Sequence, residues 1–171
     1  RPEFLRPLRE EVTRTYGAGP ISFHKLRSLS YTRAVFREAM RLYPPITFIP
    51  RVATEPTRLG AYRIKRGAML MISPWVIHRH EAHWPKPHVF EPERFTGDGE
   101  KSHRPGTYLP FGLGPRVCVG ADFATIEASL IMAELLRTFD FEMLEPETVR
   151  PMARLTTRPR EEIRARVHRR R

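Results

Sequence analysis

The sequence lacks the features that define several large classes of protein. It contains one cysteine in 171 residues, which excludes a disulfide framework and a cysteine-rich zinc module. Its longest apolar run, residues 68–77, is interrupted by Ser73 and Pro74. A membrane-spanning helix needs about 20 apolar residues, so this run is too short. With 40% hydrophobic and 29% charged residues, the composition also argues against a wholly disordered chain.

Lysine is scarce as well, because 26 of the 30 basic residues are arginine and 19 acidic residues leave a net charge of +11. Residues 150–171 hold nine arginines and two glutamates, and so carry +7 of this charge. A basic tail permits nucleic-acid binding, but this one has no aromatic residues on which bases stack. We interpret it as a solvated terminus and keep nucleic-acid binding as an alternative.

Helical spacing of apolar residues alternates with proline and glycine breaks along the chain. The first helical segment has no cap or start signal before it, so we expect the chain to be a piece of a longer protein. In residues 119–137, Phe123, Ile126, Leu130 and Ala133 share one predicted helix face. The predicted helices span residues 1–14, 31–42, 74–80 and 119–137.

The remaining segments are predicted to be extended or irregular. Residues 46–53 are rich in β-forming residues, and 57–64 and 68–73 form a predicted hairpin around residues 65–67. Residues 84–117 are rich in proline and glycine, yet they contain Trp84, Phe95 and Tyr108. We therefore expect this stretch to be irregular but packed. Short strands are expected over residues 139–167.

The strongest local signal is the segment FGLGPRVCVG at residues 111–120. Gly112 and Gly114 permit a tight turn and a close approach of the backbone to a flat ligand. Cys118 comes just before a predicted helix, whose N-terminus favours a thiolate, and Arg116 can neutralise an anion. One thiolate is a poor zinc site, since zinc takes about four ligands, but it is a suitable axial ligand for haem iron.

This segment resembles the haem-binding signature of the cytochrome P-450 superfamily, the haem-thiolate monooxygenases. The pattern F-x-x-G-x-R-x-C-x-G is complete in residues 111–120. Two further motifs of the superfamily occur in the expected order: Glu38-Ala39-Met40-Arg41, followed by Leu-Tyr-Pro-Pro, and Pro92-Glu93-Arg94-Phe95. The resemblance implies a mainly α fold with small β-sheets (α+β). Residues 1–171 would form the C-terminal portion of one haem-binding domain whose N-terminal part is absent.

The resemblance also implies roles for individual residues. Cys118 is expected to be the catalytic axial ligand of the iron of haem b. Arg51 and Arg116 are expected to meet the haem propionates, beside Phe111, Gly112 and Gly120. A buried ion network of Glu38, Arg41 and Arg94 is expected to lock the irregular stretch to its helix and hold the cysteine loop. The substrate pocket is expected to be lined by Ile46, Thr47, Phe48 and Leu155.

By the same resemblance, the expected function is insertion of one oxygen atom from O2 into a hydrophobic small molecule. A ferredoxin or flavoprotein reductase would pass on electrons from NAD(P)H, steered by a basic patch for which Arg79, Lys101 and Arg104 are candidates. One alternative is an enzyme of the same fold that uses peroxide or rearranges a hydroperoxide. The other is a non-catalytic remnant with a nucleic-acid-binding tail.

Two further expectations concern metal binding and location. His78, His80 and His83 with Glu81 lack the H-E-x-x-H spacing of zinc proteases, so we interpret these histidines as surface residues or as structural residues beside the haem. The arginine bias and the lack of a membrane-length apolar run favour a cytoplasmic bacterial protein. A microsomal protein whose anchor precedes residue 1 is the alternative.

Overall fold

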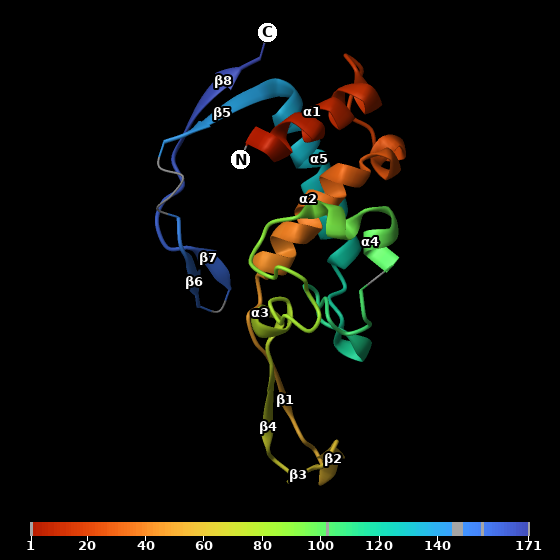
Figure 1. The fold of residues 1–171 in the computed structure, drawn as a ribbon, viewed down its shortest axis with the longest axis vertical. Coiled ribbons are helices and arrows are strands. Elements are labelled where there is room, and N and C mark those ends of the chain that lie inside the picture. The colour runs from red at the N-terminus through yellow and green to blue at the C-terminus, as the bar shows by residue number, and fades with distance from the viewer. Residues whose placement is uncertain (1, 102, 145–148, 155, 171) are drawn as a thin grey trace.

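The computed structural model describes residues 2–101, 103–144, 149–154 and 156–170, and it combines helices with small antiparallel sheets (Figure 1). The α-helices are α1 (Pro2–Tyr16), α2 (Ser30–Leu42), α3 (Pro74–Ile77), α4 (Gly97–Lys101) and α5 (Ala121–Thr138). Three 3-10 turns are η1 (Phe23–Ser28), η2 (Pro92–Phe95) and η3 (Gly114–Arg116). The strands are β1 (Ile49–Val52), β2 (Thr57–Leu59), β3 (Tyr62–Ile64), β4 (Met69–Ile72), β5 (Phe139–Met143), β6 (Pro151–Ala153), β7 (Thr157–Pro159) and β8 (Ala165–Arg169). The predicted α+β class is confirmed.

The main apolar core lies where α1, α5 and η1 meet. Val12 and Tyr16 of α1 pack there with Ala133 of α5 and with two leucines at and after η1, Leu26 and Leu29. Ile126 and Leu130 cover this cluster from α5, as their predicted face requires. Phe123, in the first turn of α5, lies outside this cluster and is 68% exposed.

Helix α2 is fastened to α1 by a buried carboxylate. Glu11 of α1 is 3% exposed and accepts hydrogen bonds from the backbone N–H groups of Tyr31 (2.7 Å) and Thr32 (2.8 Å). The hydroxyls of Thr32 (2.8 Å) and Ser30 (3.1 Å) also donate to it. Leu29, the residue before α2, has no side-chain cap, so a residue of another helix satisfies the free N–H groups of this terminus.

A second cluster anchors the irregular stretch, as the aromatic residues predicted. Trp84 and Phe95 are buried against Ala34 of α2, and the ring of Tyr108 packs beside them. The centroids of the Phe95 and Tyr108 rings are 4.8 Å apart. The guanidinium of Arg37 lies 4.6 Å from the centre of the Phe95 ring, a cation–π contact that joins α2 to this cluster.

The predicted pairing of residues 57–64 with 68–73 is wrong. The chain reverses earlier, at Gly60 and Ala61, so that β2 pairs with β3 and Leu59 lies opposite Tyr62. Gly60 has a φ of +57°, which other residues adopt only with strain. Strand β4 therefore pairs with β1, in the register Ile49↔Ile72. The β1–β4 ribbon projects away from the helices with β2 and β3 at its end (Figure 1).

The short strands expected near the C-terminus are present, and they form two more antiparallel pairs, β5 with β8 and β6 with β7. Thr157 fixes the second pair to the segment after α2. Its N–H donates to Pro45 O (2.7 Å) and its hydroxyl donates to Pro44 O (2.7 Å). No helix among the described residues is long and apolar enough to cross a membrane.

Candidate functional site

The cysteine loop runs from Phe111 to Gly120 and is closed by its own backbone. The N–H of Cys118 donates to Phe111 O at 2.9 Å, and the N–H of Val117 donates to Gly114 O at 3.0 Å. Gly112 has a φ of +80°, as the turn requires. Cys118 is a free, exposed thiol that precedes α5 and its N-cap, Gly120. The prediction that this cysteine comes just before a helix is therefore confirmed.

A cavity of about 640 Å³ opens beside Cys118, within the range of about 300–1,000 Å³ usual for ligand sites. Its walls come from α2, the segment after it, β1 and the cysteine loop. Two guanidinium groups line it, and no carboxylate belongs to the described residues of its wall. The lining residues are Met40, Pro45, Ile46, Ile49, Pro50, Arg51, Val52, Pro110, Phe111, Gly112, Arg116 and Cys118.

Six of the predicted site residues thus share one cavity, although they are up to 72 positions apart in the sequence (46 to 118). Gly120 is not in its wall, but a Cβ on this residue would lie 3.9 Å from the sulfur of Cys118. Thr47 and Phe48 are also outside the wall: Thr47 is buried and its carbonyl accepts a hydrogen bond from Ser73, while Phe48 is exposed. Leu155 lies outside the described residues.

Sequence reasoning missed half of the cavity wall. Met40 belongs to α2 and lies between the two charged residues of the E-x-x-R motif, so helical periodicity could have placed it near the site. Ile49, Pro50 and Val52 flank Arg51 in β1, while Pro45 and Pro110 precede predicted site residues. Their positions depend on how β1 lies against the cysteine loop, which no local pattern reports.

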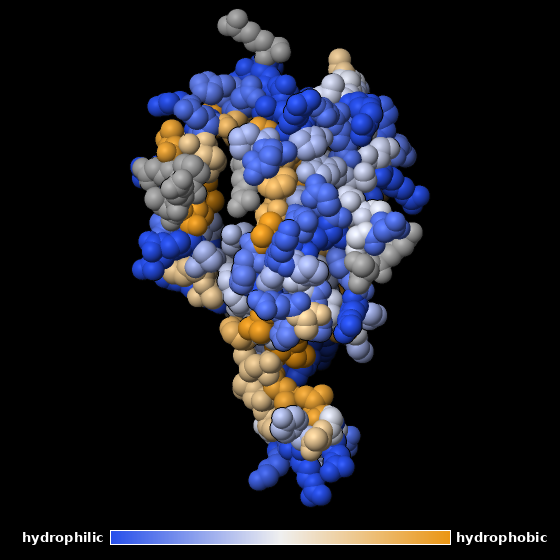
Figure 2. All heavy atoms as spheres, in the orientation of Figure 1, coloured by the Kyte–Doolittle hydropathy of each residue, from blue (hydrophilic) through white to orange (hydrophobic). Residues whose placement is uncertain are grey.

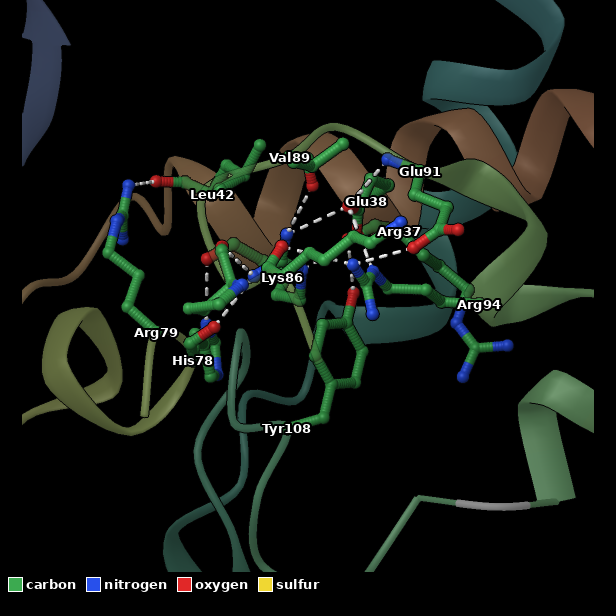
Figure 3. Close-up of polar contacts among 12 residues, drawn as sticks. Arg37, Glu38, Leu42, His78, Arg79, Lys86, Val89, Glu91, Arg94 and Tyr108 are labelled. Atoms are coloured by element: carbon green, nitrogen blue, oxygen red, sulfur yellow. Dashed lines mark hydrogen bonds and ion pairs between the residues drawn. The ribbon is translucent and has the colours of Figure 1, made fainter. Parts of the chain in front are cut away.

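The predicted ion network forms between α2 and the irregular stretch (Figure 3). Glu38 and Arg41 are 0% exposed and pair in a two-pronged geometry, with Arg41 Nε donating to Glu38 Oε2 at 2.7 Å and Nη2 donating to Oε1 at 2.8 Å. Arg94 lies 3.6 Å from Glu38 and 2.6 Å from Glu91. Two buried charges are tolerated here because they neutralise each other at short range.

The network also satisfies the backbone of the irregular stretch. Arg41 Nη1 donates to the carbonyls of His78 (2.8 Å) and Pro87 (2.7 Å), and Nη2 donates to that of Val89 (3.0 Å). The N–H of Glu91 donates to Glu38 at 2.8 Å. These bonds hold a segment without regular structure against α2, as predicted. That the network also holds the cysteine loop stays a prediction.

His78, interpreted from the sequence as a surface or structural residue, is buried. It is 0% exposed, with Nδ1 3.1 Å from Arg41 O and Nε2 accepting from the N–H of Leu109 at 2.7 Å. Burial, and to a lesser extent the positive charges of Arg41 and Arg79, lower the pKa of this imidazole to about 4. His78 is therefore neutral at physiological pH and serves a structural function within the fold.

Arg79, a candidate for the basic patch, is not a freely projecting cation. Its guanidinium lies 3.5 Å from the centre of the Trp75 ring and donates to the carbonyl of Leu42. Burial, aided by nearby Arg41, lowers its pKa to about 10. Arg104 is exposed, whereas the side chain of Lys101 lies outside the described part of the chain. The described side chains therefore include one exposed and one half-buried cation of this patch, and the patch itself stays a prediction.

The cavity has the chemistry that a haem requires. The wall includes the sulfur of Cys118, and a cysteine thiolate is a recognised axial ligand of haem iron. Apolar side chains match the macrocycle, and two guanidinium groups match two propionates. A Cβ on Gly112 would make only ordinary contacts, 3.7 Å from the carbonyl oxygen of Arg116 and 4.0 Å from Ile49, so its positive φ is what favours glycine here. The residues present fit the group.

Comparison with known proteins agrees with this geometry. Residues 1–165 match the sequence profile of the cytochrome P450 family. The chain is 34% identical over 149 residues to cytochrome P450 3A40 of Oryzias latipes, which covers 86% of this chain and 30% of that protein. It is 40% identical over 124 residues to thromboxane-A synthase of Macaca fascicularis, covering 72% of this chain and 23% of that protein.

Solved structures show the same fold. The haem domain of cytochrome P450DA superposes with a TM-score of 0.92 at 29% identity, covering 99% of this chain and 38% of that one. Retinoic acid-bound cyanobacterial CYP120A1 superposes with a TM-score of 0.91 at 26% identity, covering 98% and 39%. The chain belongs to the cytochrome P450 family, and it spans less than two fifths of the length of these relatives.

Proposed function

We propose that this chain forms the cysteine-ligand side of a haem-thiolate monooxygenase that oxidises a hydrophobic small molecule. The observation that carries the proposal is the convergence of Cys118, Arg51 and Arg116 on one apolar cavity in a chain of the cytochrome P450 family. When bound, a thiolate-ligated haem supplies the chemistry of oxygen activation. The residues of the chain bind and orient that group.

Each residue has a separate task in this proposal. The thiolate of Cys118 would bind the iron, and the guanidinium groups of Arg51 and Arg116 would pair with the propionates. Phe111 and Gly112 would face the macrocycle on the cysteine side. The complete motif of residues 111–120 supports these assignments, and so does the likeness to the solved haem domain of cytochrome P450DA.

The substrate would be apolar, because apolar side chains dominate the walls around Ile46 and Ile49. We also propose Thr47, Phe48 and Leu155 as parts of the substrate pocket, on the resemblance alone. The names of the relatives range from secologanin synthase to thromboxane-A synthase, so family membership does not define one substrate.

The first experiment tests ligation by the thiolate. The reading frame that encodes this sequence is expressed in full, loaded with haem, and compared with its Cys118→Ser variant by absorption spectroscopy of the reduced, carbon monoxide-bound protein. We expect a thiolate-type band that the variant lacks. If Cys118→Ser keeps that band, Cys118 is not the ligand.

The second experiment tests whether Arg51 and Arg116 bind the haem propionates specifically or only add positive charge to the protein. Arg51→Ala and Arg116→Ala are expected to weaken haem retention in a transfer assay to an acceptor protein. Arg158→Ala provides a matched control, because Arg158 is exposed in β7 and outside the cavity wall. Equal haem loss in all three variants would count against specific propionate binding.

We further propose that a ferredoxin or flavoprotein reductase delivers electrons from NAD(P)H, and that an acidic surface of this partner is steered by the net charge of +11. The rate of electron transfer should then fall as ionic strength rises. A rate that is independent of salt would remove the steering proposal. Turnover with peroxide and no partner would instead favour the peroxide-using alternative.

The nucleic-acid alternative has less support. Three arginines of the tail form surface ion pairs: Arg150 with Glu161, Arg164 with Glu162, and Arg166 with Glu142. These carboxylates reduce the positive charge available to phosphates. Salt-sensitive binding to DNA or RNA that disappears when residues 158–171 are removed would revive this function.

A further inference from the structure

The ion network of α2 stops short of the cysteine loop. Glu38, Arg41 and Arg94 bind the backbone at residues 78, 86, 87, 89 and 91. Among the described residues, none of these bonds reaches residues 109–120. The network therefore needs an intermediary if it is to hold the ligand loop in place.

His78 occupies the position of that intermediary. Its carbonyl accepts from Arg41 Nη1, and its ring lies between the carbonyl of Arg41 and the N–H of Leu109. A backbone N–H can only donate, so Nε2 must be the acceptor and Nδ1 must carry the proton. The hydrogen bonds thus assign one neutral tautomer, in which Nδ1–H donates to the last turn of α2.

The hydrogen bonds continue from Leu109 to the ligand. The carbonyl of Leu109 accepts from the N–H of Gly112 at 3.2 Å, and the carbonyl of Phe111 accepts from the N–H of Cys118 at 2.9 Å. Leu109 is buried, so water cannot replace the imidazole as its partner without opening the fold. The position of residue 109 determines where the turn at Gly112 begins.

We propose that His78 is a positioning residue for Cys118, which couples the buried Glu38–Arg41 pair to the cysteine loop through the N–H of Leu109. The inference rests on the proposed function, since it concerns the placement of the haem ligand. His78 itself touches neither the cavity nor the thiol. It acts through the backbone of residues 109–112.

Amide substitutions separate the two hydrogen bonds of the ring. In His78→Gln the terminal amide oxygen can take the place of Nε2 and accept from Leu109. In His78→Asn the shorter side chain can replace Nδ1 toward Arg41 but does not reach Leu109. His80→Gln is the matched control, because His80 lies two residues away and is exposed.

The readout is the coordination of the iron in the haem-loaded, full-length expressed protein, measured as the thiolate-type fraction of the reduced carbon monoxide complex. The reduction potential and thermal unfolding are recorded on the same samples. We expect His78→Asn to lose most of the thiolate-type fraction and shift the potential, and His78→Gln and His80→Gln to retain both. A His78→Asn protein that is less stable but has the wild-type spectrum and potential would overturn the proposal.

A measurement on the unmodified protein covers the case in which His78→Asn does not fold. Hydrogen exchange at Leu109 should be as slow as at Cys118, because both amides would open in one cooperative step. Rapid exchange at Leu109 beside slow exchange at Cys118 would overturn the coupling. Absence of any thiolate-type band in the wild-type protein would instead refute the proposed function, so the two failures are distinguishable.

Discussion

Among the buried charges of α2, the single carboxylate of Glu38 has a large effect on the stability of the fold. Glu38 faces two guanidinium groups and a backbone N–H in a region without solvent. Its removal leaves Arg41 buried with no counter-charge, which is among the most costly changes in a folded protein. The exposed pair of Arg6 and Glu10 in α1 has similar 2.8 Å geometry but is surrounded by water.

We therefore predict that Glu38→Gln lowers the free energy of unfolding by about 3–5 kcal/mol, measured by urea titration. Glu10→Gln serves as the control and should change stability little, because an exposed ion pair contributes little. Equal effects of the two substitutions would contradict the assignment of Glu38 as a buried structural anion.

His78 gives the protein a predictable response to acid. Its pKa is about 4 in the folded state and 6.5 in an unfolded chain, so between these values the unfolded state binds more protons. Stability is then fully present above pH 6.5 and declines as the pH falls toward 4, by about 3 kcal/mol in total. The test compares urea titrations from pH 7 to 4.5 in wild type and His78→Gln, and the variant should show the smaller decline.

At the scale of elements, α2 begins correctly because α1 supplies its cap. The carboxylate of Glu11 binds the N–H groups of Tyr31 and Thr32 from a residue about 20 positions away. Helix α2 in turn places Met40 in the cavity wall and places Glu38 and Arg41 in the ion network. The entry angle of α2 is thereby tied to the packing of α1.

Loss of this cap should destabilise the packing of α1 against α2. We predict that Glu11→Ala lowers the free energy of unfolding by about 2–4 kcal/mol, since removal of the buried carboxylate leaves four donors without their acceptor. Glu10→Ala, its exposed neighbour in the sequence, is the control for helix propensity. A thermal unfolding midpoint shared by the two variants would refute the capping role.

For the whole molecule, the important property is the openness of the site. Cys118 is exposed, and apolar side chains around it, such as Val117 and Leu113, are exposed as well. Figure 2 shows that apolar residues also gather along the β1–β4 ribbon, where Val52, Met69 and Met71 are exposed. Large exposed apolar surfaces of this kind mark places where other protein or ligand binds.

We predict that the 171 residues by themselves, loaded with haem, do not catalyse oxygenation. The cysteine side of the cofactor would be held, but much of its other face would be in contact with water, and water-exposed sites stabilise reactive chemistry poorly. The assay is product formation with a reductase system and an apolar substrate. Turnover that is lost in Cys118→Ser would contradict this prediction.

Local sequence determined much of the fold and the chemistry of the site. The boundaries of α2 and α5, the C-terminal strands and the packing of Trp84, Phe95 and Tyr108 follow from periodicity, breakers and aromatic content. The cysteine motif likewise places its thiol before a helix, because its glycines come directly before a segment with helical periodicity. Such features depend on interactions between near neighbours, and the sequence records those directly.

Only the tertiary structure decided which distant groups meet. The pairing of β1 with β4 depends on a turn at Gly60, and the cap of α2 depends on Glu11 in another helix. The buried position of His78 and the neutral tautomer that its neighbours impose likewise require Arg41 and Leu109 on opposite sides of the ring. Hydrogen bonds and burial between segments far apart in the chain depend on the packed arrangement, so no local pattern predicts them.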